Sequence, residues 1–419
     1  MHNLFKTISA REEWEDIMGH NILIGLSGGP SVAINSSLAG IIHAAVSNPA
    51  FDKIYGAHHG IEGVLEDHLI DLSPFADEKS LALLRQTPAM ALGSCRKKLR
   101  PEDYSRIDER MQQYGIGAFF YIGGNDSMDT VMQLDRHFKS AGIKVQVIGV
   151  PKTIDNDLPV TDHTPGFGSA AKYLYYTMNE IIKDSGIYPV KNVVIVEVMG
   201  RDSGWLTLAA GLSHYRKGGP PHIIALPEVP FDQYGFIDQI KTLLKTERTV
   251  ICAVSEGIRD KSGEYIGAEA KSGRIDTFGH PYLSGVGKYL EYLVAEKLGC
   301  KVRSIELNVL QRCASHLASK TDLDEAYWIG EEAVRYALLG ESGVTMVFRR
   351  RAGDAYQIDI AATPVENVAN MAKDVPERWL DLSDETVRQE IINYLLPLIQ
   401  GDFIPVRDET GLPVYIDLF

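Results

Sequence analysis

The stretch VPKTIDNDLP, residues 150–159, concentrates polar groups in a loop that follows an apolar run. A proline near each end encloses Lys152, Asp155 and Asp157. Aspartate and asparagine are common in turns, where their side chains bond to the local backbone. A carboxylate within reach of a substrate hydroxyl is also what a general base requires. The stretch therefore predicts a strand that ends in a polar loop, and both a structural and a catalytic interpretation are open.

Short β-branched runs alternate with longer segments of helical periodicity along most of the chain. The runs lie at residues 22–26, 118–122, 145–150, 193–199, 223–226, 250–255 and 344–348. Helical spacing occurs at residues 34–46, 127–137, 168–184, 236–246, 284–298, 325–339 and 385–399. This alternation predicts an α/β fold with parallel, doubly wound sheets, in which ligands bind at the carboxyl ends of the strands.

The composition limits the classes of protein to which the chain can belong. Its 419 residues carry 42 basic and 56 acidic side chains, a formal net charge of −14, and 45% of them are hydrophobic. Such an acidic chain is expected to form two or three domains and to bind neither nucleic acid nor an anionic membrane. The four cysteines form no CxxC pair, and the first 20 residues lack a signal-peptide pattern. No apolar run approaches the ~18 residues of a membrane span, so a reduced, cytoplasmic protein is predicted.

Two glycine pairs follow predicted strands. In SGGPS (27–31), Gly28 and Gly29 let backbone amides approach an anion at the start of a helix. The stretch lacks the GK[ST] of a Walker loop and the spacing of a dinucleotide fingerprint. It does match G-x-S-x-G around Ser27, the pattern of a hydrolase nucleophile, and a tight strand–helix turn explains it equally well.

The second pair opens GGNDS (123–127). Ser127 can cap the following helix, and Asp126 suits the positive end of the helix dipole. Together with the acidic loop after residue 150, three strand ends would present amides or carboxylates at one edge of a sheet. That combination suits a phosphate group bound with magnesium.

Basic side chains follow the later strands. Three stretches are predicted as loops at the strand ends of a second lobe: MGRDS (199–203), SEG (255–257) and VRSIELNVLQR (302–312). They carry Arg201, Glu256, Arg303 and Arg312. Surface exposure is the usual fate of an arginine, but an arginine directly after a buried parallel strand faces the ligand edge. An acidic chain that binds an anion must concentrate its basic residues in such a place.

Seven stretches, taken in order, closely resemble the phosphofructokinase superfamily: SGGPSVAIN, GSCRKK, IGGNDS, PKTIDND, VEVMGR, VSEG and VLQR. They span residues 27–312, and PKTIDND together with VEVMGR is a highly specific pair. The resemblance implies two doubly wound parallel-sheet domains of phosphofructokinase type, with the active site in the cleft between them. It also implies transfer of a phosphoryl group to the 1-hydroxyl of fructose 6-phosphate.

Domain boundaries are suggested by VTDHTPGFG (160–168), which has the turn-forming composition of a hinge. Residues 1–165, with part of 313–365, would form a donor domain that binds the phosphate donor and Mg²⁺. Residues 166–312, with segment 366–419, would form a sugar-phosphate domain. The last 60 residues contain a predicted helix and an extended tail, in which the sequence shows no chemistry.

Carried over residue by residue, the resemblance assigns three catalytic side chains: Asp155, as general base for the acceptor hydroxyl, Lys152 and Asp126. The donor-binding residues would be Gly28, Gly29, Arg96, Gly124 and Ser127. The sugar phosphate would be bound by Thr153, Ile154, Asp155, Met199, Gly200, Arg201, Glu256, Arg303 and Arg312. In the family, the arginine that matches Arg303 comes from the neighbouring subunit, so a homo-oligomer is expected, with a homodimer favoured.

Two positions separate donor types in the family, and here they are Asp126 and Lys152. ATP-dependent members have glycine at both, so the chain resembles the pyrophosphate-dependent branch. A carboxylate at position 126 occupies the space of a nucleotide's α-phosphate and repels it. A cation at position 152 helps hold a donor that has no nucleoside. The predicted reaction is reversible and gives fructose 1,6-bisphosphate and phosphate.

Three positions depart from the family pattern. Asn125 stands where a magnesium-associated aspartate is usual, and its amide oxygen can face the metal but brings no charge. Mg²⁺ would be held through Asn125 and Asp126, with Asp157 or water as further ligands that stay open. Val309 replaces a sugar-binding His or Tyr, and Asn192 replaces a second arginine that acts across subunits. Three alternatives stay open: sedoheptulose 7-phosphate as the main acceptor, a non-catalytic regulatory subunit, and a serine hydrolase built on Ser27, which would leave PKTIDND unexplained.

Overall fold

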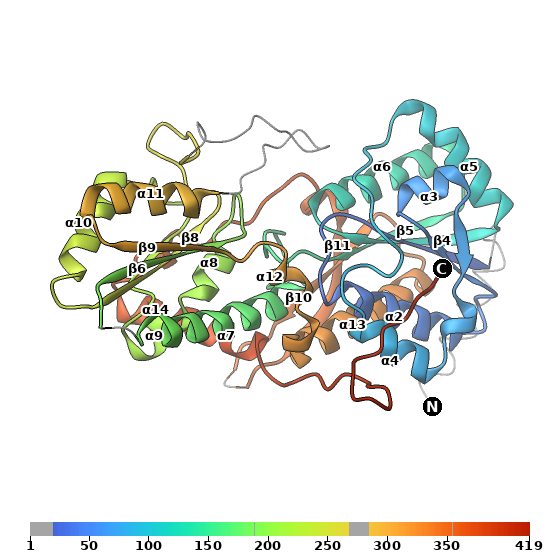
Figure 1. The fold of residues 1–419 in the computed structure, drawn as a ribbon. Helices are drawn as coiled ribbons and strands as arrows, with labels where there is room; N and C mark the ends of the chain where they lie inside the picture. The colour runs from blue at the N-terminus through green and yellow to red at the C-terminus, as the bar shows by residue number, and fades with distance from the viewer. Residues whose placement is uncertain (1–19, 188, 268–284, 354) are drawn as a thin grey trace.

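Two lobes stand side by side in the computed structural model, each built on a sheet between layers of helices (Figure 1). The structure describes residues 20–187, 189–267, 285–353 and 355–419. The first lobe, on the right of Figure 1, contains a seven-stranded sheet, and the second lobe contains a four-stranded sheet. Within the described ranges, no helix is both long enough and apolar enough to span a bilayer.

The first sheet has the strand order β11-β10-β5-β4-β1-β2-β3. Its parallel centre consists of β1 (Asn21–Leu26), β4 (Ile116–Gly123) and β5 (Gln146–Pro151). All eight residues of β4 are buried, which explains its largely apolar sequence, because helices cover both faces of the sheet. The outer pairs are antiparallel: β10 (Val344–Arg350) with β11 (Ile358–Pro364), and β2 (Ile54–Ala57) with β3 (Leu69–Asp71).

The second sheet has the order β7-β8-β6-β9, and all of its strands are parallel. Its centre consists of β6 (Asn192–Val198) and β8 (Thr249–Ser255). One edge is β7 (Ile223–Ala225), and the other is β9 (Lys301–Glu306). Since both sheets are largely parallel and lie between helices, the predicted α/β class is confirmed.

Helices cover both faces of each sheet. On the first lobe, one face carries α2 (Ile34–Val46), α4 (Glu78–Gln86) and α13 (Lys320–Leu338), and the other carries α3 (Ile61–Glu66), α5 (Tyr104–Gln113) and α6 (Asn125–Ala141). On the second lobe, one face carries α7 (Phe167–Ser185), α8 (Trp205–Ala210), α9 (Leu212–Lys217) and α14 (Glu385–Leu398), and the other carries α10 (Gln233–Leu243) and α11 (Val286–Leu298). The faces that these helices bury form the apolar cores of the two lobes.

The chain passes between the lobes repeatedly. It leaves the first lobe after β5, returns before α13, leaves again after β11 and returns after α14. As a result, β10 and β11 complete the first sheet although they follow the whole second sheet in the sequence. The final segment, red in Figure 1, packs on the first lobe, where the Gln86 side chain donates to the Val406 carbonyl oxygen at 3.0 Å.

Every predicted strand and helix is present, with its ends shifted by a few residues. The helix start predicted at residue 284 and residues 1–19, on which the signal-peptide prediction rests, lie outside the described residues. The predicted loop 302–312 is partly wrong, since it contains most of β9 and the short helix α12 (Leu310–Cys313). Polar residues are interspersed in β9 because it is a partly exposed edge strand, so it forms no continuous apolar run.

Candidate active site

The carboxyl ends of β1, β4 and β5 bring the predicted donor and acidic loops together. The Lys152 ammonium donates to the Gly29 carbonyl oxygen and lies 3.5 Å from the position that a Cβ would take on Gly28. A Cβ on Gly124 would lie 3.6 Å from the Lys152 carbonyl oxygen. Gly28 has a φ of +80°, which a residue with a side chain rarely adopts. These four residues therefore surround one point at the edge of the first sheet.

A cavity of about 660 Å³ opens beside this point. Its lining includes Gly28, one acid, and four cations: Arg96, Lys97, Lys98 and Arg100. The Ser94 hydroxyl, also in the lining, donates to the Gly28 carbonyl oxygen at 2.7 Å and so ties the cationic loop to the donor loop. This is the local concentration of positive charge that an acidic chain needs in order to bind an anion. Of these four cations, the sequence predicts a role only for Arg96, although all four lie in the run RKKLR (96–100).

Ser127 and Asp126 lie in the first turn of α6. The Ser127 hydroxyl is buried and has no hydrogen-bond partner among the described residues. It lies against Gly123, where a Cβ would come within 2.0 Å of it. The half-exposed Asp126 carboxylate is 3.8 Å from the Lys98 ammonium, beside the cavity. Both predicted residues therefore border the place where the donor loops meet.

Asn125 begins α6, and both of its polar groups have protein partners. Its amide oxygen accepts from the Asn370 N–H at 2.6 Å, and its amide nitrogen donates to the Met371 carbonyl oxygen. In the parts of the chain that the structure describes, no group of three or more His, Cys, Asp or Glu side chains is arranged to hold a metal ion. A metal at this edge would therefore be held by one or two protein side chains together with a bound substrate.

The acidic loop after β5 carries groups whose pKa values are shifted toward neutrality. Burial raises the pKa of Asp155 to about 7, and the negative charges of Asp157 and Glu256 act in the same direction. The positive charges of Lys152 and Arg201 oppose that shift. Burial also lowers the pKa of Lys152 to about 7, against the effect of Asp155. A carboxyl group that titrates near neutral pH is suited to take a proton from a substrate hydroxyl.

Contacts on both sides hold the acidic loop. The Asp155 N–H donates to the Thr153 hydroxyl at 3.1 Å, and the Thr164 hydroxyl donates to the Thr153 carbonyl oxygen at 2.8 Å. The Ile154 side chain is buried in the core of the second lobe. Asp155 is thus carried by a segment that is anchored in both lobes.

The end of β6 presents the predicted sugar-phosphate residues of the second lobe. The Gly200 N–H donates to a Glu256 carboxylate oxygen at 3.3 Å, and the φ of +119° at Gly200 favours glycine. The Met199 N–H donates to the Gln311 side chain at 3.2 Å. The Arg201 Nε is buried and has no hydrogen-bond partner within the described ranges. A buried donor of this kind is costly unless a ligand supplies an acceptor.

The two remaining arginines are placed differently. Arg312, in α12, reaches the donor loop, where one of its terminal nitrogens is 3.5 Å from the Cβ position of Gly29. Burial lowers the pKa of Arg312, and the neighbouring Arg96 lowers it further. Arg303 is exposed on β9 opposite Val194, in the middle of the strand. The structure therefore brings Arg312 to the donor loop at the carboxyl edge of the first sheet. Arg303 is not brought there.

Comparison with known proteins identifies the family of the chain. The family model for phosphofructokinase matches residues 21–336. The two-lobed α/β fold is that of the phosphofructokinases, which are phosphotransferases. The chain belongs to the phosphofructokinase family, as the resemblance of its loops predicts.

Several relatives match nearly the whole chain. A pyrophosphate–fructose 6-phosphate 1-phosphotransferase of Halomonas elongata is 39% identical over 402 residues, covering 94% of this chain and 95% of the relative. A protein of the same name from Xanthomonas campestris is 39% identical over 405 residues, covering 95% and 96%. The crystal structure of pyrophosphate-dependent phosphofructokinase from Marinobacter aquaeolei matches with a TM-score of 0.83 and 35% identity, covering 94% of this chain and 95% of that chain.

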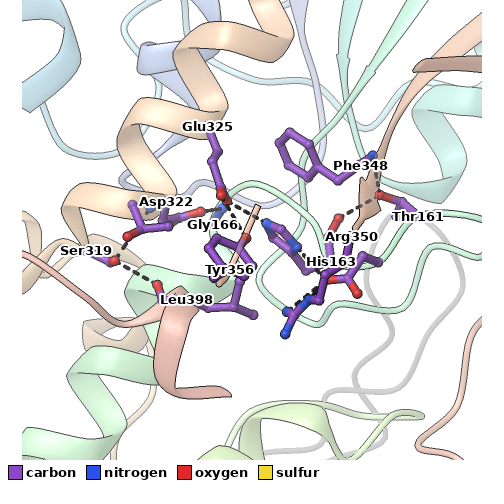
Figure 2. A network of polar contacts seen from close by, with 12 residues as sticks. Thr161, His163, Gly166, Ser319, Asp322, Glu325, Phe348, Arg350, Tyr356 and Leu398 are labelled. Atoms are coloured by element: carbon purple, nitrogen blue, oxygen red, sulfur yellow. Dashed lines mark hydrogen bonds and ion pairs between the residues drawn. The ribbon is translucent and has the colours of Figure 1, made fainter. Parts of the chain in front are cut away.

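A buried polar network follows the acidic loop (Figure 2). The His163 imidazole, 1% exposed, lies 2.9 Å from Asp162 and 2.7 Å from Glu325. Tyr356 donates to the other Glu325 oxygen at 2.7 Å, and Arg350 pairs with Asp162 at 2.9 Å. Burial by itself would lower the pKa of His163, but Glu325 and Asp162 raise it to about 9. The network fastens the segment after the acidic loop to α13 and to β10.

The raised pKa of His163 predicts a contribution to stability that depends on pH. Because the folded pKa of about 9 exceeds the ordinary value of 6.5, the contribution is complete below pH 6.5 and is lost as the pH rises through 9. We expect His163→Gln to lower the free energy of unfolding at low pH by about 3 kcal/mol, and the melting temperature with it. The difference from wild type should shrink above pH 9 in thermal melts.

The matched control is His43→Gln. Its imidazole also faces a glutamate, Glu331 at 2.8 Å, but is half exposed, so the melting temperature should change little. A destabilisation by His163→Gln that stays constant from about pH 6 to about pH 10 would contradict a histidine held protonated by the network.

Proposed function

We propose that the protein catalyses reversible transfer of a phosphoryl group from pyrophosphate to the 1-hydroxyl of fructose 6-phosphate, giving fructose 1,6-bisphosphate and phosphate. The names of relatives that cover nearly the whole chain support this reaction. One observation carries the proposal: a buried lysine, Lys152, joins the donor loop at Gly29 to the acidic loop that contains Asp155. Pyrophosphate has no nucleoside by which to be held, so its recognition depends on charge placed in this way.

The first lobe supplies the donor site. The cations of the cavity would hold the pyrophosphate oxygens together with Ser127 and the backbone at Gly28, Gly29 and Gly124. The negative charge of the donor would raise the pKa of Lys152 and so complete its positive charge. Lys152 can then stabilise the charge that develops on the leaving phosphate.

The second lobe supplies most of the acceptor site. Asp155 takes the proton of the acceptor hydroxyl as that oxygen attacks the phosphoryl group. The unpaired Arg201 Nε suits the sugar phosphate, and Glu256 fixes the turn that carries Arg201. The remaining contacts are assigned to Thr153, Ile154, Met199, Gly200 and Arg312. Arg303, exposed on its own subunit, would complete the site of a neighbouring subunit, so the active form is a homo-oligomer, in its simplest form a homodimer.

We propose that the two lobes are a donor domain and a sugar-phosphate domain. The donor domain comprises residues 1–165 with part of 313–365, since β10 and β11 belong to the first sheet. The sugar-phosphate domain comprises residues 166–312 with the segment that includes α14. The tail after α14 packs on the first lobe through Gln86, so we assign it to the donor domain.

Mg²⁺ is the proposed metal. It is commonly held by one or two carboxylates together with substrate phosphates, and a complete cage of protein ligands is not required. The Asp126 carboxylate beside the cavity fits this role, whereas the polar groups of Asn125 are engaged by the backbone. Bound there, Mg²⁺ would neutralise charge on the donor phosphates.

The alternatives receive unequal support. Sedoheptulose 7-phosphate stays a candidate acceptor because Val309, 49% exposed, replaces a polar sugar-binding residue of the family. A regulatory subunit is disfavoured because the charges of Lys152 and Arg201 both act on Asp155 in the acidic loop. A hydrolase is disfavoured because the buried Ser27 hydroxyl donates to the Cys95 carbonyl oxygen at 3.4 Å, which gives it no general base.

Removal of the general base is the first test. Asp155→Asn should lower kcat by about 10²–10⁴-fold. The KM for fructose 6-phosphate should hardly change, because the arginines carry that binding. The control is Asp359→Asn, an exposed aspartate on β11 that is paired with Arg351 and lies in none of the proposed site loops, which should keep its activity. Near-normal turnover of Asp155→Asn would remove this residue from the mechanism.

Donor choice is tested by the ratio of kcat/KM with pyrophosphate to kcat/KM with ATP. Wild type should favour pyrophosphate strongly. Asp126→Gly should lower the ratio because it opens room for an α-phosphate. Lys152→Gly should lower it because it removes the cation. A wild type that prefers ATP would overturn the donor assignment, and a ratio unchanged by Asp126→Gly would place the exclusion elsewhere.

Assembly across subunits is tested by mixing two inactive chains. Asp155→Asn and Arg303→Ala proteins should each be nearly inactive. After they are mixed and reassembled, activity should return, since some hybrid sites contain both native residues. Mass spectrometry would verify that hybrids form. Hybrids without activity would show that Arg303 does not act on the neighbouring site.

A further inference from the structure

Residues 370–375, between β11 and α14, contact both lobes and the acidic loop, and we call this segment the strap. The start of α6 holds it to the first lobe. The Asn125 amide oxygen accepts from the Asn370 N–H at 2.6 Å, and the Asn125 amide nitrogen donates to the Met371 carbonyl oxygen. The Asn370 side chain donates to Asp129 at 2.8 Å. One side chain of the donor loop thus satisfies two consecutive residues of the strap.

Lys373 binds the strap to the acidic loop. Its backbone N–H donates to the Asp157 carbonyl oxygen at 2.7 Å, two residues beyond Asp155. Its ammonium donates to the carbonyl oxygens of Thr161 and Asp162 at 3.1 and 2.9 Å. Lys373 therefore fastens two points of the segment that leads from the proposed base toward α7.

The same residue fastens the strap to the second lobe. The Lys373 carbonyl oxygen accepts from the Ser203 hydroxyl at 3.3 Å and from the Trp205 indole N–H at 3.1 Å. Its ammonium lies 5.1 Å from the centre of the Trp205 ring, within the range of a cation–π contact. Ser203 follows Arg201 by two residues, so the strap links the acidic loop to the proposed sugar-phosphate turn.

A carboxylate reinforces this attachment. One oxygen of Glu228 accepts from the Val375 N–H at 3.1 Å and from the Gly204 N–H at 2.8 Å. The Glu228 carboxylate thus binds both the strap and the turn that follows β6. Glu228 is not among the proposed substrate contacts, yet it fixes the position of the strap relative to that turn.

The chemistry of Lys373 indicates a role beyond stability. Burial lowers the pKa of its ammonium to about 8, while Asp162 and Asp157 oppose the shift. Charge burial of this kind is an inefficient source of stability, since an apolar side chain of similar size often serves as well. Unlike an apolar side chain, the Lys373 ammonium donates directional hydrogen bonds, which fix the positions of the Thr161 and Asp162 carbonyl oxygens.

We propose that the strap positions the acidic loop for catalysis, with Lys373 as the positioning residue and Asn125 as the clip that joins the strap to the donor lobe. The proposal rests on the proposed function, in which Asp155 must be aligned with the donor. It also explains the amide at position 125. An amide can accept from one backbone group and donate to the next, whereas a carboxylate can only accept.

The first test compares two buried lysines. Lys373→Met should lower kcat by about 10–100-fold, because a small displacement of a catalytic group costs that much, with little change in the KM for pyrophosphate. Lys373→Arg, which keeps a donating cation, should recover most of the activity. The control is Lys172→Met: Lys172 is 2% exposed and donates to two carbonyl oxygens and Asp402, away from the acidic loop. It should cost stability without lowering kcat.

Hydrogen exchange of the substrate-free protein separates this proposal from the proposed function. In Lys373→Met, peptides that contain residues 152–157 should exchange faster than in wild type, and in Lys172→Met they should not. If wild type lacks activity with pyrophosphate, the function fails, but the exchange data still test the strap. A folded Lys373→Met protein with wild-type kcat and unchanged exchange would overturn the positioning role.

Asn125→Asp tests the clip against a metal-binding role. The carboxylate cannot donate to the Met371 carbonyl oxygen, so kcat should fall and residues 370–375 should exchange faster. The concentration of Mg²⁺ required for half-maximal activity should not decrease. A lower requirement for Mg²⁺ with unchanged exchange would show that position 125 faces the metal, and would overturn the clip.

Discussion

A buried amine at the meeting point of three parallel strands constrains the rest of this structure. The Lys152 ammonium is unfavourable in an apolar environment unless partners surround it, and these are the Gly29 carbonyl oxygen and the charge of Asp155. Its partners are in place only if β1, β4 and β5 end at the same level. The register, with Ile24 beside Phe120 and Phe120 beside Ile148, achieves this. A shift of one residue in a strand would turn each of its side chains to the opposite face, where it would meet the wrong layer of helices.

The second constraint is that one site draws on two lobes. Charges from the second lobe, at Arg201 and Glu256, act on the proposed base of the first. The effects of Arg201 and Glu256 on Asp155 depend on the two lobes being held together. The segment 160–168 has the turn-forming composition of a hinge, yet most of it is buried, and it is bonded to α13 and β10 through the network of Figure 2. The strap forms a second connection between the lobes, on the other side of the acidic loop. The parts of the two lobes that form the proposed site are therefore held in fixed positions.

Much of the active site was accessible from local sequence, because strands buried on both faces form apolar runs and the residues that follow them lie at the ligand edge. Asp155, Lys152, Gly28 and Arg201 lie in loops that were predicted in this way, whereas their proposed roles came from the resemblance to the family. Local pattern failed at β9, which is an exposed edge strand. It also failed at Lys373, a single lysine in a segment without periodicity, more than 200 residues from the loop it contacts.

The sequence by itself determined the α/β class, the loops that carry charge and the family to which the chain belongs. These properties depend on side chains that are close together in the chain, whose spacing reflects the local geometry of strands and turns. The tertiary structure alone decided that Lys152 is buried against Gly29, that Asn125 bonds to the strap and that Arg303 is exposed in the middle of β9. The reason is physical: burial, hydrogen-bond partners and pKa values depend on which distant segments fill the space around a group, and no local pattern encodes that neighbourhood.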